Sequence, residues 1–80
     1  MKGKYLALCL NNDGYPASLE VGKLYPVVRD RAAEKEGYLR VIDESGEDYA
    51  FAADRFHFVE LPLKVKRSLV AHAPEFAGIA

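Results

Sequence analysis

Hydrophobic and polar positions alternate in two short segments joined by an acidic stretch, a pattern that is typical of a β-hairpin. Residues 38–42 and 49–51 are rich in aromatic and β-branched side chains. The residues between them, 43–48, are Asp, Glu, Ser, Gly, Glu and Asp, which favour a solvated turn. The two segments are therefore predicted to pair as antiparallel strands.

The hydrophobic pattern also predicts the register of this hairpin. A two-residue loop would set Val41 opposite an aspartate, whereas a three-residue loop sets Val41 opposite Tyr49 and Leu39 opposite Phe51. Only the second pairing puts four large apolar side chains on one face, so Tyr49 is expected in the core. The three-residue loop requires a left-handed backbone at its third position, where Gly46 fits without a Cβ penalty.

Three further segments have the composition of strands. Pro26, in the second of them, cannot donate a hydrogen bond to a sheet, so the strand should lie at an edge there or carry a bulge. Five short strands without a long helix among them predict a small barrel or two packed sheets. The remaining expected elements are strands over 4–10, 24–29 and 56–61, a long loop over 11–20, one helical turn within 30–36 and a 3₁₀ turn over 52–55.

The last part of the chain has a different character. Pro62 can open a helix, and no Gly or Pro follows until Pro74. A helix of this length is marginal in water, so it is expected to dock its apolar stripe on its own barrel or on a partner subunit, giving a homodimer. The alternative is a frayed terminus. The stripe consists of Leu61, Val65, Leu69 and Ala73, with Val70 beside it, and Phe76 and Ile79 add apolar surface.

The order of these features resembles an SH3-like barrel. Residues 7–25 are similar to the first strand, RT loop and diverging turn of that fold, and residues 43–46 correspond to its distal hairpin. Residues 51–56 resemble the strand, 3₁₀ turn and last strand. The resemblance implies an all-β fold, a small five-stranded SH3-like barrel over 1–62, with a short C-terminal helical tail over 63–80.

The hairpin also resembles a family of short uncharacterised bacterial proteins, through the segment RVIDESGEDY at residues 40–49. That family brings no known activity with it. SH3 domains that bind proline-rich peptides use an aromatic-lined groove. Here the chain has no Trp, and Ala52 and Arg55 stand where the family places Pro and Tyr, so PxxP binding is not expected.

Composition narrows the classes of function. The 80 residues are enough for one small domain, and the net charge of −1 argues against a general nucleic-acid binder. A nucleic-acid role would need a local basic face. The basic candidates are Lys2, Lys4, Arg29, Arg31 and the tail cluster of Lys64, Lys66 and Arg67.

The number of cysteines and the length of the longest apolar run indicate the cellular location. Cys9 is the single cysteine, so no intrachain disulfide is possible, and a cytoplasmic location is expected. The apolar run at residues 5–10 is too short for a signal peptide or a membrane span, so no membrane association is expected.

No catalytic constellation stands out. Cys9 could be a nucleophile but has no nearby His, and a buried small hydrophobe is the alternative. His57 beside Asp54 could act as a general base, with a surface histidine as the alternative. The hairpin-tip acids could bind Ca²⁺, but their spacing is not that of an EF-hand, so a solvated turn is favoured and no cofactor or metal is predicted. These acids are Asp43, Glu44, Glu47 and Asp48.

The sequence thus predicts a non-enzymatic protein-interaction or accessory module with a protein partner. The alternatives are a nucleic-acid-associated small barrel and, third, an oligomeric enzyme. The plasmid-borne trimethoprim-resistance dihydrofolate reductase is such an enzyme, but it relies on a Gln and this chain has none. Tyr15 could contact a partner or pin its own loop. The candidate partner-binding residues are Tyr15, Arg55, His57, Leu69, Val70 and Phe76.

Overall fold

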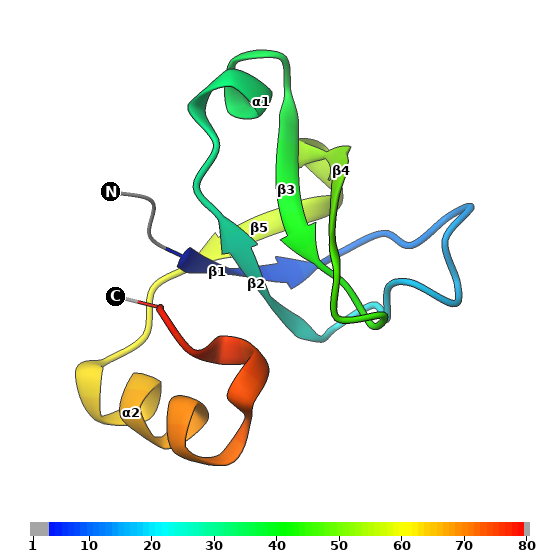
Figure 1. The fold of residues 1–80 in the computed structure, drawn as a ribbon. Coiled ribbons are helices and arrows are strands. Elements are labelled where there is room, and N and C mark those ends of the chain that lie inside the picture. The colour runs from blue at the N-terminus through cyan, green and yellow to red at the C-terminus, as the bar shows by residue number, and fades with distance from the viewer. Residues whose placement is uncertain (1–3, 80) are drawn as a thin grey trace.

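The computed structural model describes residues 4–79 and contains one antiparallel sheet of five strands in the order β4-β3-β2-β1-β5 (Figure 1). Short helical segments join or follow the strands, and the longest of them lies in the C-terminal tail. The elements are β1 Lys4–Cys9, β2 Leu24–Val28, α1 Arg31–Lys35, β3 Tyr38–Ile42, β4 Asp48–Ala52, η1 Ala53–Arg55, β5 Phe56–Val59, α2 Leu63–His72 and η2 Pro74–Phe76. The domain is therefore small, compact and predominantly β, with all five predicted strands present.

Local sequence signals explain the connections between the strands. The helical turn expected within 30–36 is confirmed as α1, which begins where the Asp30 carboxylate accepts a hydrogen bond of 3.1 Å from the Ala33 N–H. The expected 3₁₀ turn is confirmed as η1. The strands β1, β2 and β5 each end one or two residues earlier than the sequence predicts.

The β3–β4 hairpin has the predicted register. Val41 pairs with Tyr49 and Leu39 pairs with Phe51. Gly46 has φ +84°, and its N–H donates to the Asp43 carbonyl at 3.0 Å. The Asp43 N–H in turn donates to the Glu47 carbonyl at 3.1 Å, so two successive residues oppose Asp43, as in a G1 bulge.

The expectation that Tyr49 belongs to the core is wrong. Its side chain is 51% exposed, although it shares a face with Phe51, which is buried. The reason is its place in the sheet, because β4 is an edge strand and, among the described strands, β3 alone pairs with it. The long loop after β1 reaches Phe51 but leaves Tyr49 uncovered.

The main core lies on one face of the sheet and takes at least one residue from every strand. It also contains Leu19, a residue of the long loop that the strand pattern did not select. Leu19 is 1% exposed, so the loop folds back over the sheet and closes this core from one side. The buried members are Ala7, Cys9, Leu19, Tyr25, Val27, Val41, Phe51 and Phe56.

Pro26 lies in a central strand, but at a position where the strand is unpaired on one side within the described part of the chain, as expected for a residue that cannot donate a hydrogen bond to the sheet. β3 pairs with β2 only at Val27 and Val28, so within residues 4–79 β2 has no strand partner on that side at Pro26. Pro26 is opposite Leu6 in β1, and both side chains are buried although neither belongs to the main core. A second, smaller apolar layer therefore lies on the other face of the sheet.

The C-terminal tail covers this second layer with its last turn rather than with its helix. Phe76 is 6% exposed, and η2 packs against β2. Ile79 then forms a parallel bridge with Lys4, whose Nζ donates to the Ala77 carbonyl at 2.9 Å. The chain end thus returns to the start of β1, as Figure 1 shows.

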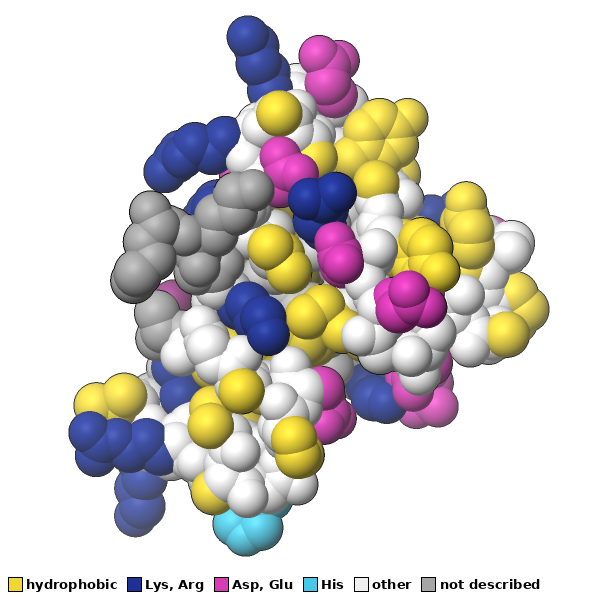
Figure 2. Space-filling view, viewed as in Figure 1, with side chains coloured by type: hydrophobic (Ala, Val, Ile, Leu, Met, Phe, Trp, Pro, Cys, Tyr) yellow, Lys and Arg dark blue, Asp and Glu magenta, His cyan; other side chains and the backbone are white. Residues whose placement is uncertain are grey.

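Helix α2 itself buries no residue. The predicted stripe is only half-covered at Leu69, and Val65 and Val70 are exposed. On the face shown in Figure 2, exposed hydrophobic side chains and Lys or Arg side chains lie together over α2 at the lower left. Within residues 4–79, no helix has the length and apolar character needed to cross a bilayer.

Candidate functional site

The long loop and the β3–β4 hairpin form the two walls of a groove. Tyr15 stands on the loop wall, where its carbonyl accepts hydrogen bonds from the Ser18 and Leu19 N–H groups at 3.1 and 3.0 Å. Its ring meets Phe51 edge-on, with 5.1 Å between the centroids, and the Arg55 guanidinium lies 4.9 Å from the ring centroid. Tyr15 therefore pins its loop to the core, and 44% of it still faces solvent.

The opposite wall is the free edge of β4. Hydrogen-bonded and non-hydrogen-bonded pairs alternate along an antiparallel ladder. Because Asp43 and Glu47 form a hydrogen-bonded pair, the pair of Val41 and Tyr49 is hydrogen-bonded too. The backbone N–H and C=O of Ala50, the next residue, consequently point away from β3.

These walls enclose an open groove of about 460 Å³. Tyr15 and Tyr49 are its two exposed aromatic side chains, and Ser18 and Ser45 supply hydroxyl groups. Ala50, whose backbone faces outward, also lines the groove, so the groove combines an unpaired strand edge with aromatic contact surface. The chemistry available there is recognition of an extended backbone and of apolar side chains.

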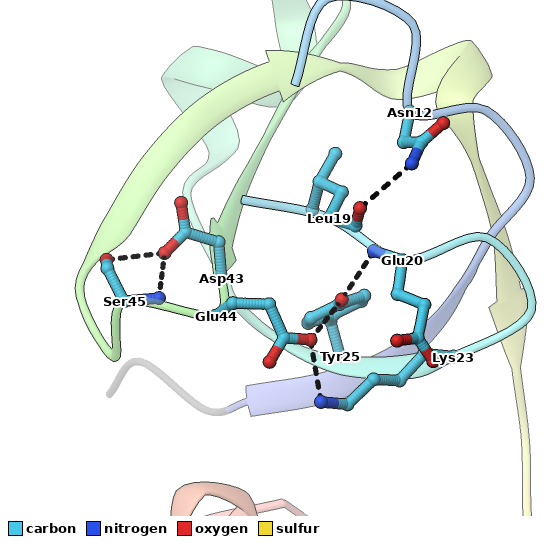
Figure 3. A network of polar contacts seen from close by, with 8 residues as sticks. All are labelled: Asn12, Leu19, Glu20, Lys23, Tyr25, Asp43, Glu44 and Ser45. Atoms are coloured by element: carbon cyan, nitrogen blue, oxygen red, sulfur yellow. Dashed lines mark hydrogen bonds and ion pairs between the residues drawn. The ribbon is translucent and has the colours of Figure 1, made fainter. Parts of the chain in front are cut away.

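A polar network fixes the two walls relative to each other (Figure 3). The buried Tyr25 hydroxyl accepts a hydrogen bond from the Glu20 N–H at 2.7 Å and donates to the Glu44 carboxylate. Lys23 Nζ lies 2.6 Å from the same carboxylate. The Glu44 N–H also donates to the Ser18 carbonyl at 3.0 Å, so the hairpin tip is tied directly to the long loop.

The network shifts the pKa values of three of its members, and the hydrogen bond to Glu44 raises the pKa of the Lys23 ammonium above its ordinary value of 10.5. Hydrogen bonds from Lys23 and then from Tyr25 lower the pKa of the Glu44 carboxyl below its ordinary value of 4.5. Burial, followed by the hydrogen bond to Glu44, raises the pKa of the Tyr25 hydroxyl above its ordinary value of 10.0. The folded state therefore prefers an ionised Glu44 and a neutral Tyr25.

Tyr25→Phe is expected to lower the free energy of unfolding by about 1–2 kcal/mol at pH 7, because the Glu44 carboxylate loses a donor and the Glu20 N–H loses its acceptor. Glu44 has a lowered pKa in the fold, so its contribution is present above about pH 4.5 and is lost as pH falls through the folded value. Tyr25 has a raised pKa, so its contribution is present below about pH 10 and is lost as pH rises further.

Urea unfolding of wild type and Tyr25→Phe across this pH range checks the prediction. The difference between them should be largest near neutrality and should shrink at both extremes. Tyr49→Phe is the control, because its hydroxyl forms no hydrogen bond with any residue from 4 to 79. A pH-independent difference for Tyr25→Phe would contradict the proposed coupling.

The structure brings together only some of the predicted partner-binding residues. Arg55 lies beside Tyr15 but does not itself line the groove, and its Nη1 donates to the Asn11 carbonyl at 3.3 Å. His57 is exposed on β5, opposite Leu8, and does not line the groove. The other three candidates lie in the tail, where Val70 is exposed, Leu69 is half-buried and Phe76 is buried against the sheet.

Sequence reasoning missed the contribution of β4 to the site, since an unpaired strand edge depends on the order of strands in the sheet. The hairpin-tip acids do not converge on one point. Asp43 accepts hydrogen bonds from Ser45, Glu44 pairs with Lys23, and Asp48 pairs with Arg40 at 2.8 Å. In the part of the chain that the structure describes, no three His, Cys, Asp or Glu side chains are grouped so as to hold a metal ion.

Cys9 occupies the interior. Its thiol is buried in the main core, and burial raises its pKa above the ordinary value. A thiol held in its protonated form has little nucleophilic character, since the thiolate is the reactive species. Cys9 is thus a small apolar core residue.

Comparisons of the chain with protein-family models, curated proteins and solved structures find no match.

Proposed function

We propose that the domain is a non-enzymatic protein-interaction module with an SH3-like barrel, and that it binds an extended peptide segment of a partner protein along the β4 edge. Five antiparallel strands, a long loop after β1 and a 3₁₀ turn between β4 and β5 support the barrel assignment. The observation that carries the binding mode is the unpaired Ala50 backbone in the groove between Tyr15 and Tyr49.

An added strand fits this groove for two reasons. The outward N–H and C=O of Ala50 offer one donor and one acceptor, which is the pattern that a peptide uses when it extends a sheet. Exposed tyrosines on either side give apolar area with little loss of side-chain freedom on binding. The groove differs from a polyproline site, because the chain lacks Trp and the 3₁₀ turn ends at Arg55 rather than at an aromatic residue.

Selection of a displayed library of random linear peptides against the 80-residue chain tests this proposal. Selected peptides should bind the Tyr15→Ala variant at least about tenfold more weakly, because tyrosines that become buried in an interface contribute much of its binding energy. Ala50→Pro should lower the affinity for these peptides to a similar extent, because it removes the outward N–H. The hydrogen bonds between β4 and β3 are kept. In NMR titrations, the amide shifts should centre on β4.

Two controls make the result interpretable. His57→Ala, on exposed β5, should leave peptide affinity unchanged. A PxxP peptide should give no saturable shifts. Saturable PxxP shifts on the long loop and η1, or selected peptides indifferent to both groove variants, would contradict the proposal.

A nucleic-acid-associated barrel is the second candidate function. One observation favours it, because the fold gathers four of the basic side chains around a single pocket on another part of the surface.

A further inference from the structure

A second concave site lies where β1, β5 and the C-terminal tail meet. It has a volume of about 340 Å³ and shares no residue with the groove between the long loop and β4. Its walls come from segments far apart in sequence, since Lys4 lies in β1, Phe58 in β5 and Ile79 near the chain end. The parallel bridge between Lys4 and Ile79 holds the tail against this side of the sheet.

Positive charge dominates this pocket. Among residues 4–79, four cationic side chains line it together with one carboxylate, that of Glu60. The chain as a whole has a net charge of −1, so the pocket is a local excess against the overall balance. The four cations are Lys4, Arg29, Arg31 and Lys66.

The four cationic side chains differ in whether a carboxylate of the protein already pairs with them. Arg29 pairs with Glu34 at 2.8 Å, and Lys66 pairs with Glu60 at 2.7 Å. Lys4 Nζ donates to a backbone carbonyl and has no carboxylate partner among residues 4–79. Arg31 is exposed, and no described residue forms an ion pair with it. Lys4 and Arg31 are therefore the charges available to an incoming anion.

An aromatic surface adjoins these charges. Tyr5 and Phe58 lie side by side, with 5.5 Å between their ring centroids and 50° between their planes. The Arg29 guanidinium covers Tyr5 at 4.6 Å from its centroid, and so Tyr5 is already engaged. Phe58 is 54% exposed, an unusual exposure for a phenylalanine in a strand. Its ring is open to a planar ligand.

We infer that this pocket binds a nucleotide unit, with the base stacked on Phe58 and the phosphate held by Arg31 and Lys4. Base–aromatic stacking beside a cationic groove is the general chemistry of single-strand recognition, and it needs no sequence-specific contacts. A phosphate alone would satisfy the charges but would leave Phe58 exposed, and a purely apolar ligand would leave the charges unused. The unit could come from a free nucleotide or from a single-stranded nucleic acid.

Titration of the 80-residue chain with adenosine 5′-monophosphate, adenosine, inorganic phosphate and a single-stranded oligothymidylate tests this inference, with NMR shifts as the readout. The monophosphate should shift the amides of Tyr5 and Phe58 and should bind more tightly than adenosine or phosphate. Oligothymidylate binding that is tighter and falls steeply with salt would assign the unit to single-stranded nucleic acid. Equal affinity for the mononucleotide and the oligomer would assign it to a free nucleotide.

Variants of exposed residues connect the binding to this pocket. Arg31→Glu should weaken the monophosphate about tenfold or more, and Phe58→Ala should weaken it about 5- to 150-fold through lost stacking. Arg67→Glu makes the same charge change on exposed α2, outside the pocket, and should have little effect. Phe58→Leu, which keeps an apolar side chain, provides a second variant in case Phe58→Ala lowers the melting temperature.

Two results would overturn the inference. The first is absence of saturable shifts with both the monophosphate and the oligomer. The second is equal binding of inorganic phosphate and the monophosphate with no loss in the Phe58 variants, which would leave only a simple anion site.

Discussion

Phe76→Ala is expected to lower the free energy of unfolding by about 3–5 kcal/mol, the usual cost of removing a buried phenylalanine ring. Phe76 is 6% exposed, and the turn that carries it packs against β2 next to Pro26. Removing the ring leaves a cavity and uncovers apolar surface on that face of the sheet. Because small domains are only marginally stable, this loss is a large fraction of the total. Urea unfolding followed by circular dichroism measures it.

Val70→Ala is the matched control, because Val70 lies on the exposed side of α2 and its truncation should change stability by less than about 0.5 kcal/mol. A chain that ends at Pro62 separates the possible roles of the tail. If the tail serves its own sheet, the shortened chain is less stable and its mass in solution corresponds to the same oligomeric state. Conversion of a dimer into a folded monomer would instead support a tail that joins subunits. Unchanged stability and oligomeric state, or a neutral Phe76→Ala, would refute the docking.

The parts of the fold that could be predicted from the sequence are those fixed by neighbours in the chain. The hairpin register follows from which pairing puts Leu39 and Phe51 on one face, and Gly46 fixes the loop. The capping carboxylate of Asp30 similarly marks the start of α1 within one turn. In each case the residues that indicate the local structure are the same few neighbouring residues that form it.

The parts that could not be predicted depend on the order of strands in space. The alternation of side chains correctly puts Tyr49 and Phe51 on the same face of β4. That Tyr49 stays exposed follows only from the position of β4 at the edge of the sheet. Leu19 lies in a polar, turn-rich loop, where no periodicity marks it as a core residue. Phe76 is plainly apolar, but nothing local indicates that it covers β2 rather than a partner.

The same distinction applies to the two candidate sites. Tyr15 could be selected as a loop aromatic, whereas its contacts with Phe51 and Arg55 join segments about forty residues apart and so appear only in the fold. The basic residues Lys4, Arg29 and Arg31 are each visible in the sequence, but their convergence beside Phe58 is not. Lys2 lies outside the described residues.

Gly46→Val is expected to destabilise the domain by about 1–3 kcal/mol, through backbone strain alone. Gly46 has φ +84°, a conformation that β-branched residues rarely adopt, and a Cβ built there meets no atom within 4 Å. No steric clash therefore contributes to the cost. The strain also acts on the bulge that presents Asp43 and Glu44 to the long loop, so the loop contacts should loosen along with the hairpin.

Gly46→Asn separates strain from the mere loss of glycine, because Asn tolerates the left-handed region better than any β-branched residue. Its cost should stay below about 1 kcal/mol, clearly less than that of Gly46→Val. Chemical unfolding of both variants gives the comparison, and hydrogen exchange at the Asp43 and Glu44 amides reports whether the bulge itself has opened. If Val and Asn cost the same, the left-handed backbone at Gly46 contributes nothing specific, and the three-residue loop must be held by the pairing of Val41 with Tyr49 and by the tie from Glu44 to Ser18 instead.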